Sequence, residues 1–298
     1  MLVVMNPRAG MRQGAKNLSD ILSVFQAGGY LPTVLITEKA GDASRLVREY
    51  GKEAEVIVCI GGDGTLNEVV TGMLEAGCTH PIGYLPAGST NDFASSLGLS
   101  RDLLTAARDV VSGVPAPYDV GRFGGRCFTY VASFGAFTRT SYNTPQDVKN
   151  ALGHVAYILN GIYDLTRIRA IPMRVETDAD VFEGEYIFGA VSNSTSIGGM
   201  LHLDPEIVDL NDGLMEVLLI RVPANAAELA QLLYALSAQS FEESDCILFR
   251  STTSVRITTK EDVDWSLDGE YEKGRPLVEI VNVPDAIRVI VPQKKKDE

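Results

Sequence analysis

Ile60-Gly-Gly-Asp-Gly-Thr-Leu-Asn-Glu-Val-Val70 is the stretch that decides the fold. It joins an apolar run, Val56–Ile60, to a run with helical spacing, Leu66–Ala76. We therefore expect a buried strand that is followed directly by a helix. Its three glycines let the backbone take positive φ values and approach a phosphate closely. A helix that begins at Thr65 would offer free N–H groups to an anion. The stretch therefore predicts a phosphate-binding turn.

This turn differs from the two most familiar phosphate loops. No Lys-Ser or Lys-Thr pair follows the glycines, as a P-loop requires, and Gly61, Gly62 and Gly64 lack the spacing of a dinucleotide-binding fingerprint. A tight turn in which Asp63 or Thr65 caps the helix is the simpler alternative. Because a cap does not need three glycines, we favour a nucleotide-binding turn of another kind.

Short apolar runs alternate with helical patterns on both sides of this turn. Strands are predicted over Leu2–Met5, Thr33–Thr37, Val56–Ile60 and Pro81–Leu85, and helices over Lys16–Ala27, Ala43–Tyr50, Leu66–Ala76 and Arg101–Ser112. Strands this apolar, separated by helices, favour a mostly parallel sheet that is covered on both faces. The first 117 residues are therefore expected to form an α/β domain.

Two more polar loops follow strands of this domain. Asn6-Pro-Arg-Ala-Gly10 follows the first strand, and Pro86-Ala-Gly-Ser-Thr-Asn-Asp-Phe93 follows the fourth. In open α/β sheets ligands bind beyond the carboxyl ends of the strands. Three polar, glycine-containing loops at one edge therefore predict a binding site there.

The pattern changes after Gly113-Val-Pro-Ala-Pro117. A hairpin is predicted over Tyr118–Val131, a second over Pro172–Thr177 and Val181–Val191, and further strands over Gly213–Val222, Ser254–Thr259, Val263–Leu267, Pro276–Val281 and Ala286–Val291. Two helical patterns, Gln146–Arg167 and Ala224–Gln239, interrupt them. The second domain is therefore expected to be an antiparallel sandwich or barrel.

Composition excludes several classes of protein. The 298 residues carry a net charge of −13, the opposite of a surface that neutralises nucleic-acid phosphates. The four cysteines form no C-x-x-C pair, so neither a zinc framework nor a disulfide scaffold is indicated. No apolar run approaches the roughly 20 residues that span a bilayer. We expect a cytoplasmic protein that binds no nucleic acid.

Four motifs together resemble the diacylglycerol kinase catalytic family, specifically its soluble bacterial lipid kinases, which are related to sphingosine and ceramide kinases. They are Asn6-Pro-x-x-Gly10, Gly61-Gly-Asp-Gly-Thr-Leu-Asn-Glu68, Pro86-x-Gly-Ser-Thr-Asn-Asp-Phe93 and Leu267-Asp-Gly-Glu270. The second motif alone is shared with NAD kinases. The resemblance implies an α/β ATP-binding domain of the phosphofructokinase and NAD kinase type over residues 1–117, with residues 286–298 returning to it. A β-sandwich domain for the lipid substrate would occupy residues 118–285.

The resemblance also implies individual roles. ATP, the phosphate donor, would bind beside Asn6, Pro7, Arg8, Ala9, Gly10, Thr37, Gly61, Gly62, Asp63, Gly64, Thr65, Asn67, Glu68 and Ser89. Asp63 and Asp92 would act beside the phosphates, which makes electrostatic sense only with Mg²⁺ between them. Glu270 would be the general base that takes the proton of the lipid hydroxyl. On residues alone, Asp268-Gly269 fits a simple hairpin turn equally well.

Acidic residues gather between Asp204 and Leu214. Clustered oxygens in a glycine-containing loop can hold a hard divalent cation. The resemblance implies a structural Mg²⁺ here, bound by Asp209, Asp212 and the carbonyl of Leu214. A solvated Asn211-Asp-Gly turn is the alternative, and oxygen ligands alone do not separate Mg²⁺ from Ca²⁺.

The predicted function is transfer of the γ-phosphate of ATP to the hydroxyl of a membrane lipid, with diacylglycerol as the first candidate. The alternatives are another lipid alcohol (a sphingoid base, phosphatidylglycerol or a polyprenol), an NAD kinase-like enzyme, and a non-catalytic sensor. Residues 118–174 carry seven basic and three acidic side chains and include a helical apolar stripe over Val148–Leu165. This segment is expected to touch the inner face of the membrane transiently, although such a stripe more commonly faces a core. The sequence does not decide whether the protein forms a homodimer.

Overall fold

The computed structural model describes residues 1–135, 170–197, 201–204 and 207–293. The chain divides into two compact units, Met1–Val120 with Pro284–Glu298, and Gly121–Val283. The helix expected over Gln146–Arg167, with its flanking cations Lys149, Arg167 and Arg169, lies outside the described residues.

A parallel sheet forms the centre of the first unit. Its strands lie in the order β2 (Thr33–Ile36), β1 (Leu2–Met5), β3 (Ile57–Gly61) and β4 (Ile82–Pro86). The end of β17 (Leu277–Val291) extends the sheet, because Val289 pairs in parallel with Ile82. Strands β1, β3 and β4 are buried throughout. Their apolar runs therefore form the core, and the expected α/β class is confirmed.

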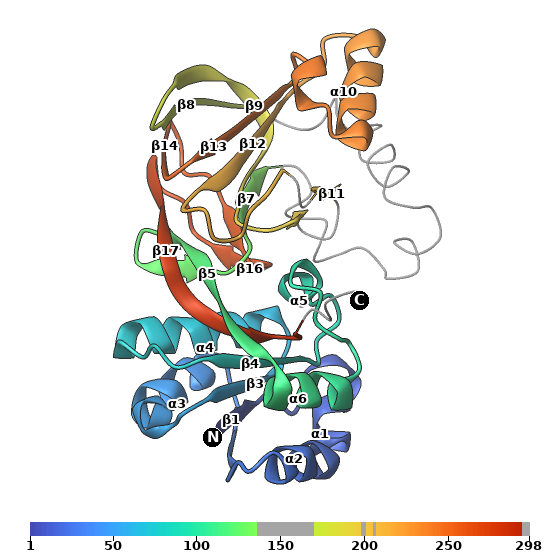
Figure 1. The fold of residues 1–298 in the computed structure, drawn as a ribbon. Helices are drawn as coiled ribbons and strands as arrows, with labels where there is room; N and C mark the ends of the chain where they lie inside the picture. Colours follow the sequence, from blue (N-terminus) through green and yellow to red (C-terminus); the bar gives the residue numbers. More distant parts are fainter. Residues whose placement is uncertain (136–169, 198–200, 205–206, 294–298) are drawn as a thin grey trace. The chain divides into compact units, whose positions relative to one another are not determined.

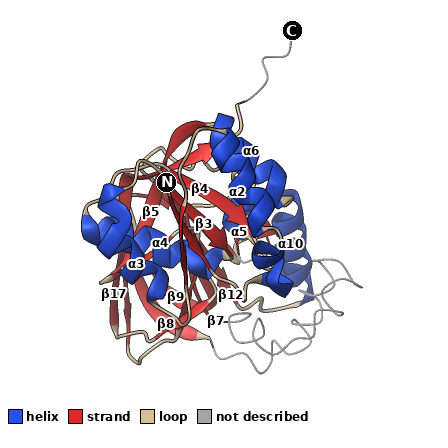
Figure 2. Ribbon diagram, turned by 90° about the horizontal axis from the view of Figure 1, so that it is seen from below, coloured by secondary structure: helices blue, strands red, loops and turns tan. Residues whose placement is uncertain are grey.

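Helices cover both faces of this sheet. They are α1 (Gln13–Lys16), α2 (Leu18–Ala27), α3 (Asp42–Tyr50), α4 (Asp63–Ala76), α5 (Asp92–Ser96) and α6 (Leu103–Ser112), with 3₁₀ turns at Gly10–Arg12 and Gly51–Glu53. On one face Phe25 of α2 and Val110 of α6 belong to the same buried cluster as Val58 of β3. Figure 2 shows α3 and α4 on the opposite face. Helix α5 was not predicted from the sequence.

The second unit is an antiparallel β-structure, as expected. Its strands are β6 (Arg126–Phe128), β7 (Val131–Gly135), β8 (Ile171–Thr177), β9 (Val181–Ser192), β10 (Ser196–Ile197), β11 (Leu201–His202), β12 (Met215–Arg221), β13 (Ile247–Thr252), β14 (Ser254–Thr259), β15 (Trp265–Leu267) and β16 (Glu270–Glu272). The order β16-β15-β7-β9-β8-β14-β17 runs through the sheet, and β12 joins it between β9 and β13. Strand β5 (Val114–Phe123) pairs with β6.

Side chains of alternate positions fill one core in this unit. Trp265 packs edge-on against Phe123 and Phe134, with ring centroids 5.1 Å and 4.9 Å apart. Figure 1 shows helix α10 (Ala226–Ala238). It is capped by Asn225, whose Oδ1 accepts the N–H groups of Ala227 and Glu228. A 3₁₀ turn, Phe241–Glu243, follows it. No helix in the described ranges has the length and apolar character that a membrane crossing requires.

Two local predictions were wrong, and some strands were missed. The strands expected over Pro276–Val281 and Ala286–Val291 form one strand, β17, which passes through a left-handed residue, Asp285 (φ 50°). The N–H of Asp285 donates to Asp119 Oδ1 at 2.9 Å, which holds the chain at this point. Strand β13 was not predicted. The hairpin expected over Tyr118–Val131 ends earlier, because Val131 begins β7 and pairs with Ser192.

Candidate active site

The three polar loops of the first unit meet at the carboxyl edge of the sheet. Asn6 Nδ2 donates to Thr65 Oγ1 at 3.2 Å, and Asn6 Oδ1 accepts the N–H of Arg8 at 2.9 Å. The loop after β1 is thereby tied to the start of α4. Gly10 lies in the left-handed region (φ 34°), and a Cβ there would be 2.2 Å from the carbonyl oxygen of Ala87. Glycine is thus required where this loop crosses the one after β4.

The glycine turn and the loop after β4 also touch through their backbones. A Cβ on Gly88 would lie 2.5 Å from Gly62 Cα, and one on Gly62 would lie 3.1 Å from Gly88 Cα. A Cβ on Gly61 would lie 2.5 Å from Thr65 Cβ. Close backbone packing therefore accounts for Gly62 and Gly88. The positive φ values expected in this turn are not found, because Gly61, Gly62 and Gly64 are not among the glycines with positive φ. Helix α4 begins at Asp63 instead of Thr65, and its N-cap is Gly62.

Asp63 connects two of the loops. Its Oδ2 accepts the N–H of Asp92 at 3.1 Å and its Oδ1 accepts the N–H of Phe93 at 3.4 Å, so the carboxylate caps α5. Asp92 itself is buried. The structure thus brings the Asp63 carboxylate to the backbone of Asp92, and it gives Asp63 a structural contact that the sequence did not reveal.

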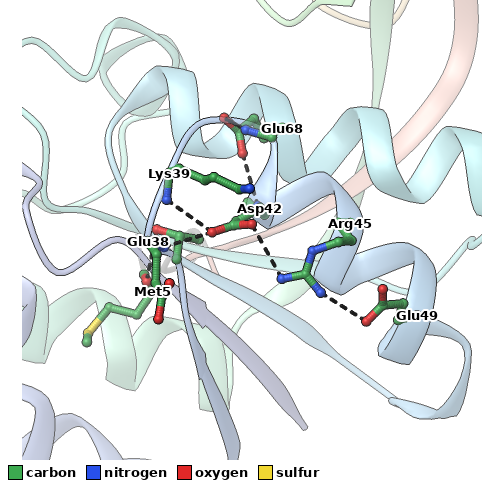
Figure 3. A network of polar contacts seen from close by, with 10 residues as sticks. Met5, Glu38, Lys39, Asp42, Arg45, Glu49 and Glu68 are labelled. Atoms are coloured by element: carbon green, nitrogen blue, oxygen red, sulfur yellow. Dashed lines mark hydrogen bonds and ion pairs between the residues drawn. The ribbon is translucent and has the colours of Figure 1, made fainter.

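Glu68 faces the protein backbone. Its two carboxylate oxygens accept the N–H groups of Gly41 at 2.8 Å and Ala43 at 3.0 Å, at the start of α3 (Figure 3). Asp42 accepts the N–H groups of Glu38 and Lys39, and these bonds, the one from Glu38 foremost, lower the pKa of Asp42. Glu68, expected at the nucleotide, therefore holds the segment after β2.

The remaining residues expected at the nucleotide have different exposures. Arg8 and Ser89 are exposed, Thr37, Gly61, Thr65 and Asn67 are buried, and Asn6, Pro7, Ala9, Gly10, Gly62, Asp63, Gly64 and Glu68 are half-buried. The edge thus presents a serine hydroxyl, a guanidinium group and glycine backbone to solvent. This is a surface suited to a polyphosphate.

Asn91 organises the loop after β4 and was not identified from the sequence. It is 3% exposed and adopts a left-handed conformation (φ 54°). Its Oδ1 accepts the N–H of Gly88, and its Nδ2 donates to the Gly88 carbonyl, both at 2.9 Å. The signal that could have revealed it is the tolerance of asparagine for this conformation within a polar loop.

In the second unit, the turn that carries Glu270 is anchored by Asp268. Asp268 and Gly269 have positive φ values, 49° and 85°, and connect β15 to β16. The Asp268 carboxylate is 4% exposed and accepts the N–H groups of Thr129, Tyr130 and Val131 at 2.6–3.1 Å. The hairpin-turn alternative is thus correct in its geometry, but the turn is much more strongly held than a surface hairpin.

Glu270 projects from this turn with its side chain 53% exposed. Its Oε2 lies 3.3 Å from Arg126 Nη2, and Arg126 Nη1 lies 2.6 Å from Glu272 Oε2. The next residue, Tyr271, donates its hydroxyl to Asp264 at 2.9 Å. An exposed carboxylate on an anchored turn can accept a proton from a substrate hydroxyl.

The acidic loop before β12 forms local turns. Asp209 Oδ1 accepts the N–H of Asn211 at 3.0 Å, and Asp212 Oδ1 accepts the N–H of Leu214 at 2.9 Å, as the solvated-turn alternative requires. Within the described ranges, no three His, Cys, Asp or Glu side chains are grouped to hold a metal. The expected set has only two carboxylates and a carbonyl, so the metal site stays a prediction.

Glu216 lies two residues beyond this loop and is 2% exposed. Its Oε2 has no hydrogen-bond partner among the described residues. Burial foremost, together with the charges of Asp212 and Asp209, raises the pKa of Glu216 to about 8. Without a cation this carboxyl is mostly protonated at neutral pH. A divalent ion beside it would favour the ionised form, and the unpartnered Oε2 is an oxygen of the kind that such an ion binds.

Comparisons with known proteins match both units. A family model described as the diacylglycerol kinase catalytic domain covers residues 1–123, and one described as the YegS C-terminal NAD kinase beta sandwich-like domain covers residues 131–291. A diacylglycerol kinase of Bacillus subtilis (strain 168) is 34% identical over 299 residues, covering 99% of this chain and 97% of the relative. A diacylglycerol kinase of Staphylococcus saprophyticus is 30% identical over 297 residues, covering 99% and 96%.

Solved structures support the fold. A crystal structure of a diacylglycerol kinase from Bacillus anthracis str. Sterne matches with a TM-score of 0.75 at 21% identity, over 98% of this chain and 96% of the other. Together, the family models, the full-length relatives and the four motifs in place lead to one conclusion. The chain belongs to the diacylglycerol kinase catalytic family and is a phosphotransferase whose acceptor is an alcohol group.

Proposed function

We propose that this protein transfers the γ-phosphate of ATP to the hydroxyl of diacylglycerol and so produces phosphatidic acid. The observation that carries the proposal is the Glu270 carboxylate, which stands exposed on a turn fixed by Asp268. The relatives named diacylglycerol kinase, at 30–34% identity over nearly the whole chain, favour diacylglycerol over the other lipid alcohols.

ATP is held at the carboxyl edge of the parallel sheet. The phosphates lie against the glycine backbone of the turn after β3, and the 14-residue helix α4 directs its N-terminus toward this edge. Ser89 contributes a hydroxyl and Arg8 a cation, both on exposed side chains. Asn6 and Asn91 keep the flanking loops in shape through their hydrogen bonds.

Glu270 accepts the proton of the acceptor hydroxyl. Phosphoryl transfer passes through a loose transition state, so it needs an oriented oxygen and modest proton acceptance instead of a covalent intermediate. A carboxylate at hydrogen-bond distance from that hydroxyl meets both needs. The anchored Asp268 turn favours this role because it limits how far the Glu270 backbone can move.

Mg²⁺ is the metal proposed for both units. Asp63 and Asp92 are suited to hold it in the first unit, and Asp209, Asp212 and the carbonyl of Leu214, supported by buried Glu216, in the second. Carboxylates retain further lone pairs after accepting one N–H bond, so these contacts do not exhaust them. Mg²⁺ held by Asp63 and Asp92 would supply positive charge to neutralise phosphate oxygens.

The acceptor resides in a bilayer, so we further propose a transient contact with the membrane surface. The net charge of −13 opposes general attraction to anionic lipid, so the contact is local. Of the segment expected to make it, residues 118–135 and 170–174 are described, and they include the exposed cation Arg122.

A transfer assay across several acceptors tests the proposal. The protein is incubated with γ-labelled ATP and mixed micelles that contain diacylglycerol, phosphatidylglycerol, sphingosine or a polyprenol, with NAD as the water-soluble alternative. The expected result is label in phosphatidic acid at a rate at least about tenfold above any other product. Preferential labelling of another lipid would replace diacylglycerol as acceptor, and labelling of NAD alone would refute the lipid assignment.

A further inference from the structure

Arg126 bridges the two glutamates of the short strand β16. Its Nη1 lies 2.6 Å from Glu272 Oε2, and its Nη2 lies 3.3 Å from Glu270 Oε2. Nη1 also lies 3.5 Å from the carbonyl of Tyr271. One guanidinium group, from a strand more than 140 residues earlier in the chain, therefore contacts three successive residues of β16.

Strand geometry makes this bridge possible. Successive side chains of a strand point to opposite faces, so Glu270 and Glu272 share one face and Tyr271 points to the other. The planar guanidinium presents its nitrogens as a fork, which can serve two carboxylates at once. The shorter contact, to Glu272, fixes the guanidinium and leaves Nη2 directed at Glu270.

Glu270 depends on this contact for its orientation. The Asp268 anchor fixes the backbone of the turn, but the Glu270 side chain is 53% exposed and free to rotate about its own bonds. In the part of the chain that the structure describes, Arg126 is the only hydrogen-bond partner of the Glu270 carboxylate. Arg126 is therefore the group that selects one orientation of this carboxylate.

We propose that Arg126 is a positioning residue that holds the Glu270 carboxylate ready for the acceptor hydroxyl, with Glu272 anchoring Arg126 in turn. The inference rests on the proposed role of Glu270 as base. Loss of the Arg126 contacts should lower the turnover rate more than the free energy of unfolding, because ion pairs between exposed side chains contribute little to folding. A small misplacement of a reacting group, in contrast, lowers the rate substantially.

Four variants and a matched control test the proposal in the diacylglycerol assay. R126Q removes the cation, R126K keeps a charge without the fork, E272Q removes the anchor, and R126Q/E272Q combines two changes. The control is R256Q, because Arg256 forms an exposed pair with Glu279 at 2.7 Å on β14 and β17 of the same unit. Melting temperatures and the KM for ATP are measured for each variant.

R126Q is expected to lower kcat about tenfold with the KM for ATP unchanged within about twofold. E272Q should lower kcat less, and R126K should recover only part of the loss, since one ammonium cannot replace the fork. R126Q/E272Q should match R126Q, because Glu272 acts only through Arg126. R256Q should retain the wild-type kcat, and the melting temperature of R126Q should shift no more than that of R256Q.

Each contrary result has a separate meaning. A wild-type kcat in R126Q, or additive losses in R126Q/E272Q, would overturn the positioning role while leaving the kinase assignment intact. If R126Q does not fold, R126K and E272Q carry the test, and a wild-type kcat in both would overturn the role. A wild-type protein that phosphorylates no lipid would remove the proposed function, and the role of Arg126 with it.

Discussion

Thr129 and Asp268 form a doubly hydrogen-bonded pair that joins β15 to the segment before β7. The Asp268 Oδ2 accepts the backbone N–H of Thr129 at 2.6 Å and its hydroxyl at 2.8 Å, and both residues are buried. The Glu270 carboxylate is two residues away from this anchor. The same buried hydrogen bonds therefore stabilise the second unit and fix the backbone that carries the proposed base.

Replacing Asp268 by asparagine is expected to destabilise the protein by about 3 kcal/mol. An amide offers one acceptor oxygen where the carboxylate offers two, so its NH₂ group would meet buried N–H donors. T129V, which removes only the hydroxyl bond, should cost about 1 kcal/mol. The free energy of unfolding in urea measures both. Equal losses in the two variants would contradict the anchoring role of the carboxylate.

The D63N variant should lose at least about 100-fold in kcat and only about 1 kcal/mol in stability. The amide retains one oxygen for the N–H groups of Asp92 and Phe93, but it removes a charge expected beside the phosphates. Glu55 is exposed in the same unit, so E55Q is the matched control for kcat and melting temperature. If D63N keeps most of its turnover, Asp63 serves only to cap α5.

Glu216 gives a test of the proposed cation site that does not require turnover. At a MgCl₂ concentration about 100 times the Kd, the wild-type protein should gain about 2.7 kcal/mol of stability. In E216Q and in D212N most of this gain should disappear, whereas the exposed E279Q control should keep it. Unfolding with and without MgCl₂ gives the values. A full gain in E216Q would exclude a role for its buried carboxylate in binding the cation.

Asp178 predicts how stability depends on pH. The Thr253 hydroxyl, which donates at 2.7 Å, is the main cause that lowers the pKa of Asp178 to about 2, and the Thr253 N–H and Ser254 hydroxyl act in the same direction. Because the folded pKa lies below the ordinary value of 3.8, the stabilisation is complete above about pH 4 and is lost as pH falls toward 2. D178N should therefore lose less stability than the wild type between pH 5 and pH 2. Parallel curves for the two proteins would contradict this prediction.

Contiguous apolar runs made much of the fold predictable. Leu2–Met5 forms β1 over the predicted residues, and α3 begins one residue before the predicted helix, at Asp42. Helix α5 was missed because five residues are too few for a periodic pattern and because its cap, Asp63, lies about thirty residues earlier in the chain. Strand β13 was missed because Arg250 and its polar neighbours interrupt the apolar alternation.

The candidate site was predictable where residue type is informative by itself. Three glycines in one turn predicted a backbone that a phosphate can approach closely. The structure adds a second reason for Gly62, its close contact with Gly88. The hydrogen-bond partner of a side chain could not be predicted in this way, because tertiary structure determines which groups come together. Glu68 was therefore predicted to contact the nucleotide although it caps α3, and the burial of Glu216 was not predicted.

The most direct test of the central claim is the initial rate of γ-phosphate transfer from ATP to diacylglycerol by the wild-type protein and by E270Q. The control is E279Q, which changes an exposed glutamate of the same unit. Wild-type protein and E279Q should form phosphatidic acid at similar rates, and E270Q should be at least about 100-fold slower with an unchanged melting temperature. Comparable rates in E270Q and the wild type would contradict the account, because the proposed base would then be dispensable.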